Sequence, residues 1–394
     1  MGTMDTAGYD VIVVGLGGMG SAAAYHLARR GARVLGLEQF GPAHDRGSSH
    51  GGTRVIRQAY HEGPDYVPLV LRAYELWRAL EAESGTSLLT ITGALHIGTP
   101  EAPSVAGAAL SARTHGIPVE TLTPDEVRAR YPVLRLRAGH VALYESQAGL
   151  LHPERCVEAH LDAARRRGAD LRFHEAVEAW SAGPGEVTVR TSGGAYRAGR
   201  LVLAAGPWTG QVVPDLALPL EVERVALCWF EPRAHIEEFR RLPICLWEDQ
   251  GVSAGGFPYI EGQGIKSAFH HVHGVRTTPQ TIRREVGDGE VALIREHLGT
   301  LMPDAPGTLR AVATCMYTNT PDQHFIIDRH PAHPNVVLAC GFSGHGFKFC
   351  SVVGDVLADL AMSGATAYST QMFALGRFAS RAAPSPAAPA GGEG

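Results

Sequence analysis

Three closely spaced glycines near the start of the sequence have the spacing needed to bind a pyrophosphate. Gly15, Gly17 and Gly20 match the pattern G-x-G-x-x-G. The first glycine permits a tight turn, the second lets backbone approach a phosphate, and the third lets a helix pack closely on a strand. Glu38 follows about 18 residues later, where a carboxylate can accept a hydrogen bond from a ribose hydroxyl. The pattern predicts a dinucleotide site and does not by itself distinguish NAD from FAD.

Two further glycine-rich segments favour contact with a ligand. Residues 41–63 are too polar for a core segment and form a longer stretch than an ordinary connection, which favours a functional loop. Residues 340–348 have the sequence CGFSGHGFK and directly precede a helical pattern. Because a long dinucleotide needs contacts from distant parts of the chain, these two loops favour FAD over NAD.

The elements around the first glycine turn predict a βαβ unit. A strand is expected over residues 9–14, an Ala-rich helix over 19–30 and a buried strand over 32–37. Further helices are expected from residue 65, over 153–168 and 289–301, and after residue 348. Strands are expected over 171–177, 186–190, 200–205, 325–327 and 336–339. A hairpin turn is expected at 192–194. Helical spacing predicts two core faces, formed by Val67, Val70, Leu71, Tyr74 and Trp77 and by Val352, Val353, Val356, Leu357 and Leu360.

The composition predicts a globular protein and disfavours several other classes. The chain has 394 residues, of which 45% are apolar and 19% charged, with a net charge of −5. This balance is unlike the basic footprint of nucleic-acid-binding proteins, and no apolar run approaches the roughly 18–20 residues of a membrane span. The first ten residues lack the features of a signal peptide, so a cytoplasmic location is expected. The six cysteines form no CxxC pair, and neither a metal site nor a disulfide framework is expected.

Three longer motifs lie outside the glycine turn. They are GSSHGGTRVIRQAYHEGPDYVPL over 47–69, CMYTNTPDQHFIID over 315–328 and GFSGHGFKF over 341–349. In these motifs the sequence resembles the flavoprotein amine oxidases that include monomeric sarcosine oxidase and N-methyltryptophan oxidase, and the similarity spans residues 9 to about 375. The resemblance implies FAD bound covalently through Cys315. It also implies oxidation of a secondary amine at its N-methyl carbon by O2, giving the primary amine, formaldehyde and hydrogen peroxide.

The resemblance also assigns roles to single residues, and each role has a physical reason. Arg57 and Lys348 would bind the substrate carboxylate, because cations, and a planar fork above all, suit that group. Lys266 would assist the reaction with oxygen by supplying a fixed positive charge. The remaining candidates are Glu62 as the partner of Arg57, Arg54 against the flavin ring, His50, His270 and Tyr317 in the catalytic pocket, Gly344 and Gly346 where backbone approaches the flavin and substrate, and Phe347 at the cofactor.

The sequence departs from the family pattern at a few positions. Gly255 stands where sarcosine oxidases have a tyrosine, which predicts a roomier pocket that admits N-methyl or cyclic amino acids bulkier than sarcosine. The family's GSHHGDTR becomes Gly47–Arg54 with Ser49 and Gly52 in place of a histidine and an acid. Three other functions remain open: a flavin oxidase that attacks the α-carbon of a D-amino acid, glycine or a cyclic amino acid, an NAD-dependent dehydrogenase, and a dinucleotide-binding sensor without enzymatic activity.

The expected fold is α/β (α+β) with two discontinuous domains. An FAD-binding, Rossmann-like domain is expected over 8–91, 152–220 and 315–378. A second domain, mainly antiparallel sheet, is expected over 92–151 and 221–314 and would roof the flavin. The site would lie at their junction, a usual place for pockets. A monomer is expected, with amino-acid substrate and O2 as its small-molecule partners and a disordered tail over 381–394.

Overall fold

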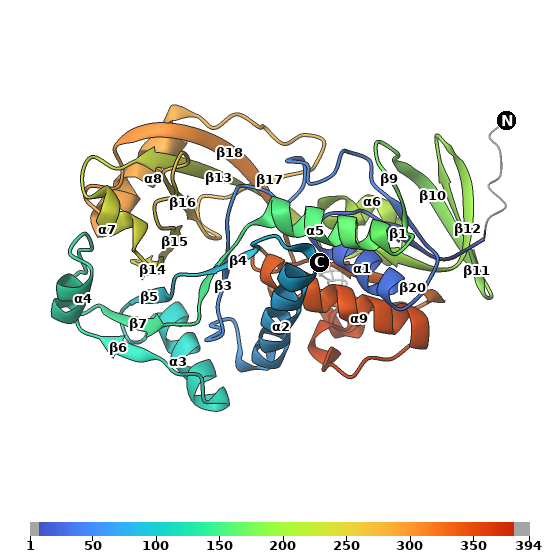
Figure 1. Ribbon diagram of the computed structural model, residues 1–394, viewed down its shortest axis with the longest axis horizontal. Helices are drawn as coiled ribbons and strands as arrows, with labels where there is room; N and C mark the ends of the chain where they lie inside the picture. Colours follow the sequence, from blue (N-terminus) through green and yellow to red (C-terminus); the bar gives the residue numbers. More distant parts are fainter. Residues whose placement is uncertain (1–7, 382–394) are drawn as a thin grey trace, which may run out of the picture.

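The computed structural model describes residues 8–381 of the chain. They form two large β-sheets and one small one, with helices packed mainly on the first large sheet (Figure 1). The expected tail over 381–394 lies outside the described residues except for Arg381, which ends the last 3-10 helix. None of the helices in residues 8–381 combines the length and apolar character that crossing a bilayer requires.

The first large sheet contains the predicted βαβ unit. Strand β1 (Tyr9–Val14) pairs in parallel with β2 (Val34–Leu37), and helix α1 (Gly18–Arg29) connects them. Four residues of β1 and all of β2 are buried, because both faces of a parallel sheet are covered. The sheet order is β10-β11-β12-β1-β2-β9, and β20 pairs with β12 and β19. The other strands are β9 (Asp170–Arg172), β10 (Val177–Gly183), β11 (Glu186–Thr191), β12 (Gly194–Leu203), β19 (Ile326–His330) and β20 (His333–Cys340).

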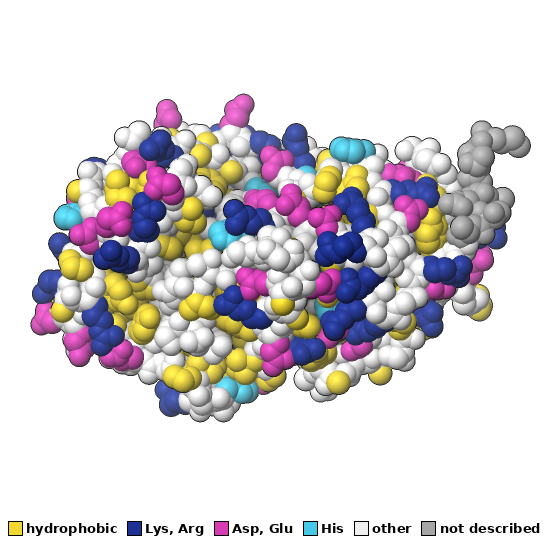
Figure 2. Space-filling model, viewed as in Figure 1, with side chains coloured by type: hydrophobic (Ala, Val, Ile, Leu, Met, Phe, Trp, Pro, Cys, Tyr) yellow, Lys and Arg dark blue, Asp and Glu magenta, His cyan; other side chains and the backbone are white. Residues whose placement is uncertain are grey.

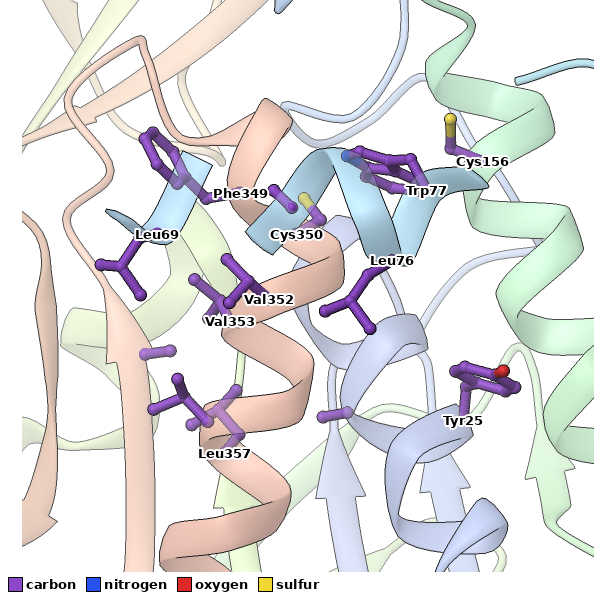
Figure 3. Close-up of a cluster of buried hydrophobic side chains, with 14 of the residues drawn as sticks. Tyr25, Leu69, Leu76, Trp77, Cys156, Phe349, Cys350, Val352, Val353 and Leu357 are labelled. Atoms are coloured by element: carbon purple, nitrogen blue, oxygen red, sulfur yellow. The ribbon is translucent and has the colours of Figure 1, made fainter. Parts of the chain in front are cut away.

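Four helices form the main hydrophobic core beside this sheet. They are α1, α2 (Val67–Ser84), α5 (Pro153–Arg166) and α9 (Cys350–Ser363). Figure 3 shows α9 at the centre, with side chains such as Val353, Leu357 and Leu76 directed into the shared interior. Helix α2 follows a 3-10 turn at Pro64–Tyr66 and ends at Ser84, before Gly85, whose left-handed backbone caps the helix.

The second large sheet has nine strands and forms the other half of the molecule. Its order is β17-β13-β16-β15-β14-β5-β7-β6, and β18 also pairs with β13. Its strands are β5 (Ala94–Gly98), β6 (Glu120–Leu122), β7 (Val141–Glu145), β13 (Glu221–Glu231), β14 (Ile244–Asp249), β15 (Val252–Gly256), β16 (Ile265–Phe269), β17 (Val275–Thr277) and β18 (Thr308–Asn319). The expected domain boundary between residues 314 and 315 falls inside β18, which pairs antiparallel with β13 as far as Asn319.

Shorter elements complete the structure. A three-stranded sheet, β3 (Arg54–Ile56), β8 (Gly149–Leu151) and β4 (Leu89–Ile91), lies between the two large sheets in Figure 1. The remaining helices are α3 (Pro103–His115), α4 (Pro124–Arg130), α6 (Thr209–Val212), α7 (Ile236–Arg240) and α8 (Asp288–Leu301). Further 3-10 turns span Gly206–Trp208, Pro214–Leu216, Phe347–Phe349, Gln371–Phe373 and Leu375–Arg381.

The structure corrects four expectations about these elements. The strand expected over 171–177 is interrupted, because β9 ends at Arg172 and β10 begins at Val177. The expected loop over 41–63 contains strand β3, which pairs with β8. The strand expected over 200–205 begins at Gly194 and ends at Leu203, because it continues the hairpin from β11. Leu71 is 37% exposed, whereas Val67, Val70 and Trp77 are fully buried, since α2 is covered over only part of its circumference.

Basic and acidic side chains are interspersed on the face of the molecule shown in Figure 2.

Candidate active site

A cavity of about 930 Å³ is lined by parts of the chain that lie far apart in sequence. Its walls include the turn after β1, residues 47–49 and 53–54, parts of strands β15 and β16, residues 315–318 of β18 and the loop 341–348. This volume is near the upper end of the roughly 300–1,000 Å³ of small-molecule pockets. Most predicted site residues line it, and only Gly20 and His50 do not.

The glycine turn has the geometry that the sequence pattern predicted. Gly15 has a φ of +85°, and a Cβ there would lie 2.6 Å from the carbonyl oxygen of Ala204. A Cβ on Gly20 would lie 1.7 Å from the oxygen of Gly15, so only glycine lets α1 pack this close to the turn. A Cβ on Gly17 would have only the Ser49 hydroxyl nearby, at 3.5 Å, so its backbone borders the cavity.

The start of α1 and the end of β2 complete a cradle that fits a dinucleotide. Helix α1 has no side-chain cap and no acid in its first turn, so its positive end is available to a pyrophosphate. Glu38 is buried and accepts hydrogen bonds from the amides of Leu16 at 2.8 Å and Phe40 at 3.0 Å. A carboxylate has about four acceptor sites, so capacity remains for a ribose hydroxyl.

The loop that carries Ser48 brings Arg54 to Cys315. The Ser48 hydroxyl donates to the carbonyl of Met316 at 2.7 Å. The Arg54 guanidinium donates to the Ser48 carbonyl at 2.9 Å and lies 3.4 Å from the Cys315 sulfur. Burial alone would raise the pKa of Cys315, but Arg54, His50 and Lys266 outweigh burial and lower this pKa to about 7. A substantial thiolate fraction at neutral pH makes Cys315 a nucleophile.

The other five cysteines lack this activation. Burial raises the pKa of every one of them, and for Cys228 and Cys340 to about 12. The remaining three are Cys156, Cys245 and Cys350. The electrostatic surroundings therefore distinguish Cys315 from the other thiols without reference to any motif.

Lys266 is held by oxygens of the loop that precedes β3. Its ammonium donates to the carbonyls of Gly51 at 2.9 Å and Thr53 at 2.7 Å, and to the Thr53 hydroxyl at 3.2 Å. It also lies 4.6 Å from the ring centre of Phe257. Burial, followed by the charge of Arg54, lowers the pKa of Lys266 well below its ordinary value.

Arg57 is fixed by three neighbours at the wall of the cavity. Its guanidinium donates to the Glu62 carboxylate and to the His61 ring nitrogen Nδ1, the latter at 3.1 Å, and lies 4.5 Å from the ring centre of Tyr60. Burial alone would raise the pKa of Glu62, but Arg57 holds it well below its ordinary value. Burial lowers the pKa of His61 to about 4, so its ring is neutral. Arg57 and Glu62 therefore stay ionised as a buried pair.

Lys348 is the second cation of this wall. Its ammonium donates to the carbonyl of His345 at 2.6 Å and lies 3.5 Å from the hydroxyl of Tyr60. The carbonyl of Lys348 itself accepts from the indole of Trp77 at 2.9 Å. Burial and the charge of Arg57 lower the pKa of Lys348. A bound carboxylate would counter this effect by stabilising the ammonium.

His270, directly after β16, and Tyr317 on β18 form a neutral pair. The ring nitrogen Nδ1 of His270 lies 3.3 Å from the hydroxyl of Tyr317. Burial lowers the pKa of His270 and raises the pKa of Tyr317, so neither carries a charge at neutral pH. A Cβ on Gly344 would lie 2.7 Å from the Tyr317 ring, and one on Gly346 would lie 2.5 Å from Phe342. The loop 341–348 can therefore pack against these rings only with glycine at both positions. Phe347 lines the cavity beside this loop.

His50 does not line the cavity, but it affects the pKa of the Cys315 thiol. It is buried, and its Nε2 has no hydrogen-bond partner among the described residues. His50 also helps to lower the pKa of the Cys315 thiol, after the larger effect of Arg54.

Sequence reasoning missed several residues that organise the site. His345 accepts a hydrogen bond from Tyr60 at 2.6 Å and contacts the carbonyl of Gln323 through Nε2 at 2.9 Å. Glu154 and His61 also received no role, although each contacts a predicted site segment. One signal was available in composition: the chain has 33 arginines but only two lysines, Lys266 and Lys348, and both line the cavity.

Comparison with known proteins agrees with this geometry. Residues 10–360 match the family described as FAD dependent oxidoreductase. The chain is 51% identical to "Monomeric sarcosine oxidase" of Streptomyces avermitilis, over 93% of this chain and 96% of that one. It is 34% identical to "N-methyl-L-tryptophan oxidase" of Citrobacter koseri, over 94% and 99%.

A solved structure shows the same fold over most of both chains. The open form of NikD, "an unusual amino acid oxidase essential for nikkomycin biosynthesis", is similar with a TM-score of 0.81 and 25% identity, over 94% of this chain and 98% of that one. The expected α/β fold with a dinucleotide unit and the expected resemblance are both confirmed. The chain belongs to the FAD-dependent oxidoreductase family that includes the monomeric sarcosine oxidases.

Proposed function

We propose that this chain is an FAD-dependent oxidase that demethylates a secondary amino acid with O2, giving the primary amine, formaldehyde and hydrogen peroxide. One observation supports this most directly. The cavity that contains the Gly15 turn is also lined by Arg57 and Lys348, two buried cations suited to a carboxylate. The names of the relatives, sarcosine oxidase and N-methyltryptophan oxidase, point to the same substrate class.

Different residues of the cavity bind the substrate carboxylate and orient the substrate amine. The guanidinium of Arg57 and the ammonium of Lys348 hold the substrate carboxylate, while Glu62 keeps the guanidinium fixed. His270 and Tyr317 are neutral and can hydrogen-bond the amine without adding charge. A bound FAD would supply the two-electron redox chemistry that couples oxidation of the amine to reduction of oxygen.

We propose a covalent attachment of FAD through the Cys315 sulfur. The lowered pKa of about 7 supports this role, because the thiolate is the reactive form. Arg54, 3.4 Å from the sulfur, would lie beside the ring system and stabilise negative charge on it. Lys266, on strand β16, would supply the positive charge that favours electron transfer to oxygen.

The wall around Gly255 supports a substrate larger than sarcosine. A Cβ at this position would meet only the Leu246 side chain, at 3.8 Å, so the space in front of Gly255 is open. The same open wall favours, as a second candidate, oxidation of a cyclic amino acid at a ring carbon, which would release no formaldehyde.

Oxygen uptake by the purified flavoprotein tests these alternatives. Sarcosine, N-methyltryptophan, proline and glycine are supplied in turn, and peroxide and formaldehyde are measured together. Demethylation yields one formaldehyde for each peroxide with the N-methyl substrates. Peroxide without formaldehyde from every active substrate would contradict the proposed demethylation and support attack at a ring or α-carbon.

A further inference from the structure

Lys266 contacts no carboxylate among the described residues. All three of its hydrogen bonds go to neutral oxygens, the carbonyls of Gly51 and Thr53 and the Thr53 hydroxyl. Its side chain is 4% exposed, so water compensates little for the cost of burying the charge. Something else must stabilise an ammonium at this position.

A single peptide unit connects Lys266 to a carboxylate. The carbonyl of Gly51 accepts from the Lys266 ammonium at 2.9 Å. The amide of Gly52, which belongs to the same peptide unit, donates to Oε1 of Glu154 at 3.1 Å. The preceding amide, that of Gly51, donates to the same oxygen at 2.6 Å. The peptide dipole between Gly51 and Gly52 therefore lies between opposite charges, with each end facing the charge that it stabilises.

Local structure supports this arrangement from both sides. Gly51 and Gly52 have φ values of +100° and +74°, a backbone region that favours glycine and that turns both amides toward α5. Glu154 is the acid in the first turn of α5, where the positive end of the helix favours a carboxylate. A Cβ on Gly51 would approach Leu227 to 3.0 Å.

Charged and aromatic groups other than Glu154 also surround the Lys266 ammonium. Arg54 on β3 opposes the ammonium, and the faces of Trp229 and Phe257 pack against it. Two groups favour the ammonium electrostatically, the Cys315 thiolate and Glu154. A thioether carries no charge, so in the flavin-linked enzyme that we propose above Glu154 remains as the anion of this pair.

We propose that Glu154 is a positioning residue that keeps Lys266 charged and aimed at the cavity through the peptide between Gly51 and Gly52. This proposal rests on the proposed oxidase function, in which Lys266 assists the reaction with oxygen. Glu154 does not touch substrate or cofactor in this role. Its contribution is electrostatic and passes through one polarised amide.

The scarcity of lysine permits a direct test on the holoenzyme. Protein labelled with [ε-13C]lysine gives two side-chain NMR signals, and a Lys348→Arg variant, which lacks one of them, assigns both. The signals are titrated with pH in the wild type, in Glu154→Gln and in Glu158→Gln. Glu158 is the matched control, because it is an exposed acid one turn further along α5. Glutamine at 154 keeps an oxygen for the two glycine amides and removes only the charge.

The proposal predicts that Lys266 titrates about one pH unit lower in Glu154→Gln than in the other two proteins. Reoxidation by O2 of the dithionite-reduced flavin should slow several-fold in the same variant at pH values above that lower midpoint. An unchanged Lys266 titration in folded Glu154→Gln would overturn the proposal. If that variant does not fold, Glu154→Asp retains the charge at a greater distance. That variant should lower the titration midpoint of Lys266 by less than the change expected for Glu154→Gln. An unchanged midpoint would overturn the proposal.

The experiment separates this proposal from the proposed function. Reduction of the flavin by an N-methyl amino acid under anaerobic conditions tests the oxidase function alone. The lysine titration and the reoxidation of chemically reduced enzyme involve no amine. If the amine fails to reduce the flavin but the lysine titration and the reoxidation change as expected, the substrate assignment is wrong and the role of Glu154 stands.

Discussion

The indole of Trp77 on α2 donates a hydrogen bond to the main-chain carbonyl of Lys348 at 2.9 Å. Trp77 is fully buried on α2 against α9, among the side chains of Figure 3, so a core side chain fixes the backbone of a residue that we propose binds substrate. Trp77→Phe would retain most of the packing and leave that carbonyl without its partner. We expect a loss of about 1–3 kcal/mol of stability, measured by thermal unfolding. The KM for the amine should rise more than kcat falls, and an unchanged KM would contradict the link to Lys348.

Replacement of Arg57 by lysine should weaken substrate binding although the charge is kept. The lysine ammonium cannot form the planar fork that contacts Glu62 and His61 and that we propose holds the substrate carboxylate. Hydrogen bonds between charged groups contribute about 1.5–3 kcal/mol, so kcat/KM should fall about 10- to 100-fold. Steady-state kinetics measures this, with Arg128→Lys, an exposed arginine on α4, as the control. Equal kinetics in the two variants would exclude Arg57 from the carboxylate site.

Removal of the Cys315 sulfur should abolish covalent flavin attachment. In Cys315→Ala the flavin should appear in the supernatant after acid precipitation, whereas in Cys340→Ala it should stay with the protein. Cys340 is an equally buried cysteine with a raised pKa. Mass spectrometry of the peptide that contains residue 315 gives the same answer. Flavin that remains bound to denatured Cys315→Ala would refute this attachment point.

The rate of that attachment should depend on pH in a defined direction. The thiolate is the reactive form, and the pKa of Cys315 is about 7. Attachment of FAD to protein made without riboflavin should therefore accelerate as pH rises through about 7 and level off above it. Absorbance of the denatured protein against time measures the rate. A rate that still rises steeply between pH 8 and 9 would indicate an unactivated thiol.

A large side chain at Gly255 should reverse the preference for bulky substrates. The backbone of Gly255 does not have a positive φ, and the space beside it is open, so Gly255→Phe should fold. We expect kcat/KM for N-methyltryptophan to fall at least about tenfold, because the ring would occupy the open wall, and that for sarcosine to change less. Equal losses for both substrates would show that this wall does not select substrate size.

Gly20→Ala should destabilise the protein and weaken FAD binding. The added Cβ would lie 1.7 Å from the Gly15 carbonyl, a backbone atom that cannot move without opening the turn. Overpacking of this kind costs about 1–3 kcal/mol. Denaturant unfolding is the measurement, and Gly210→Ala in α6, where a Cβ meets nothing within 4 Å, is the control. Comparable stability of the two variants would contradict the proposed packing role.

The local parts of the site could be predicted from the sequence, and the long-range parts could not. The turn from Gly15 to Gly20 depends on neighbours in the chain, so its spacing sufficed. Cys315 resembled five other thiols until folding brought Arg54, His50 and Lys266 around it. Glu154 gave no signal, because its partners are the amides of a loop some 100 residues away. Leu71 fitted the helical spacing, and its exposure depends on which part of α2 its neighbours cover.

The placement of both lysines inside the cavity bears on how the enzyme would tolerate its own product. Formaldehyde condenses most readily with primary amines and then crosslinks them to nearby side chains. No lysine side chain stands on the outer surface, because the two that the chain contains line the cavity, where both are buried and hydrogen-bonded, and arginine supplies the remaining side-chain positive charge. A catalyst that releases an aldehyde at each turnover would in this way expose few sites for methylene bridges.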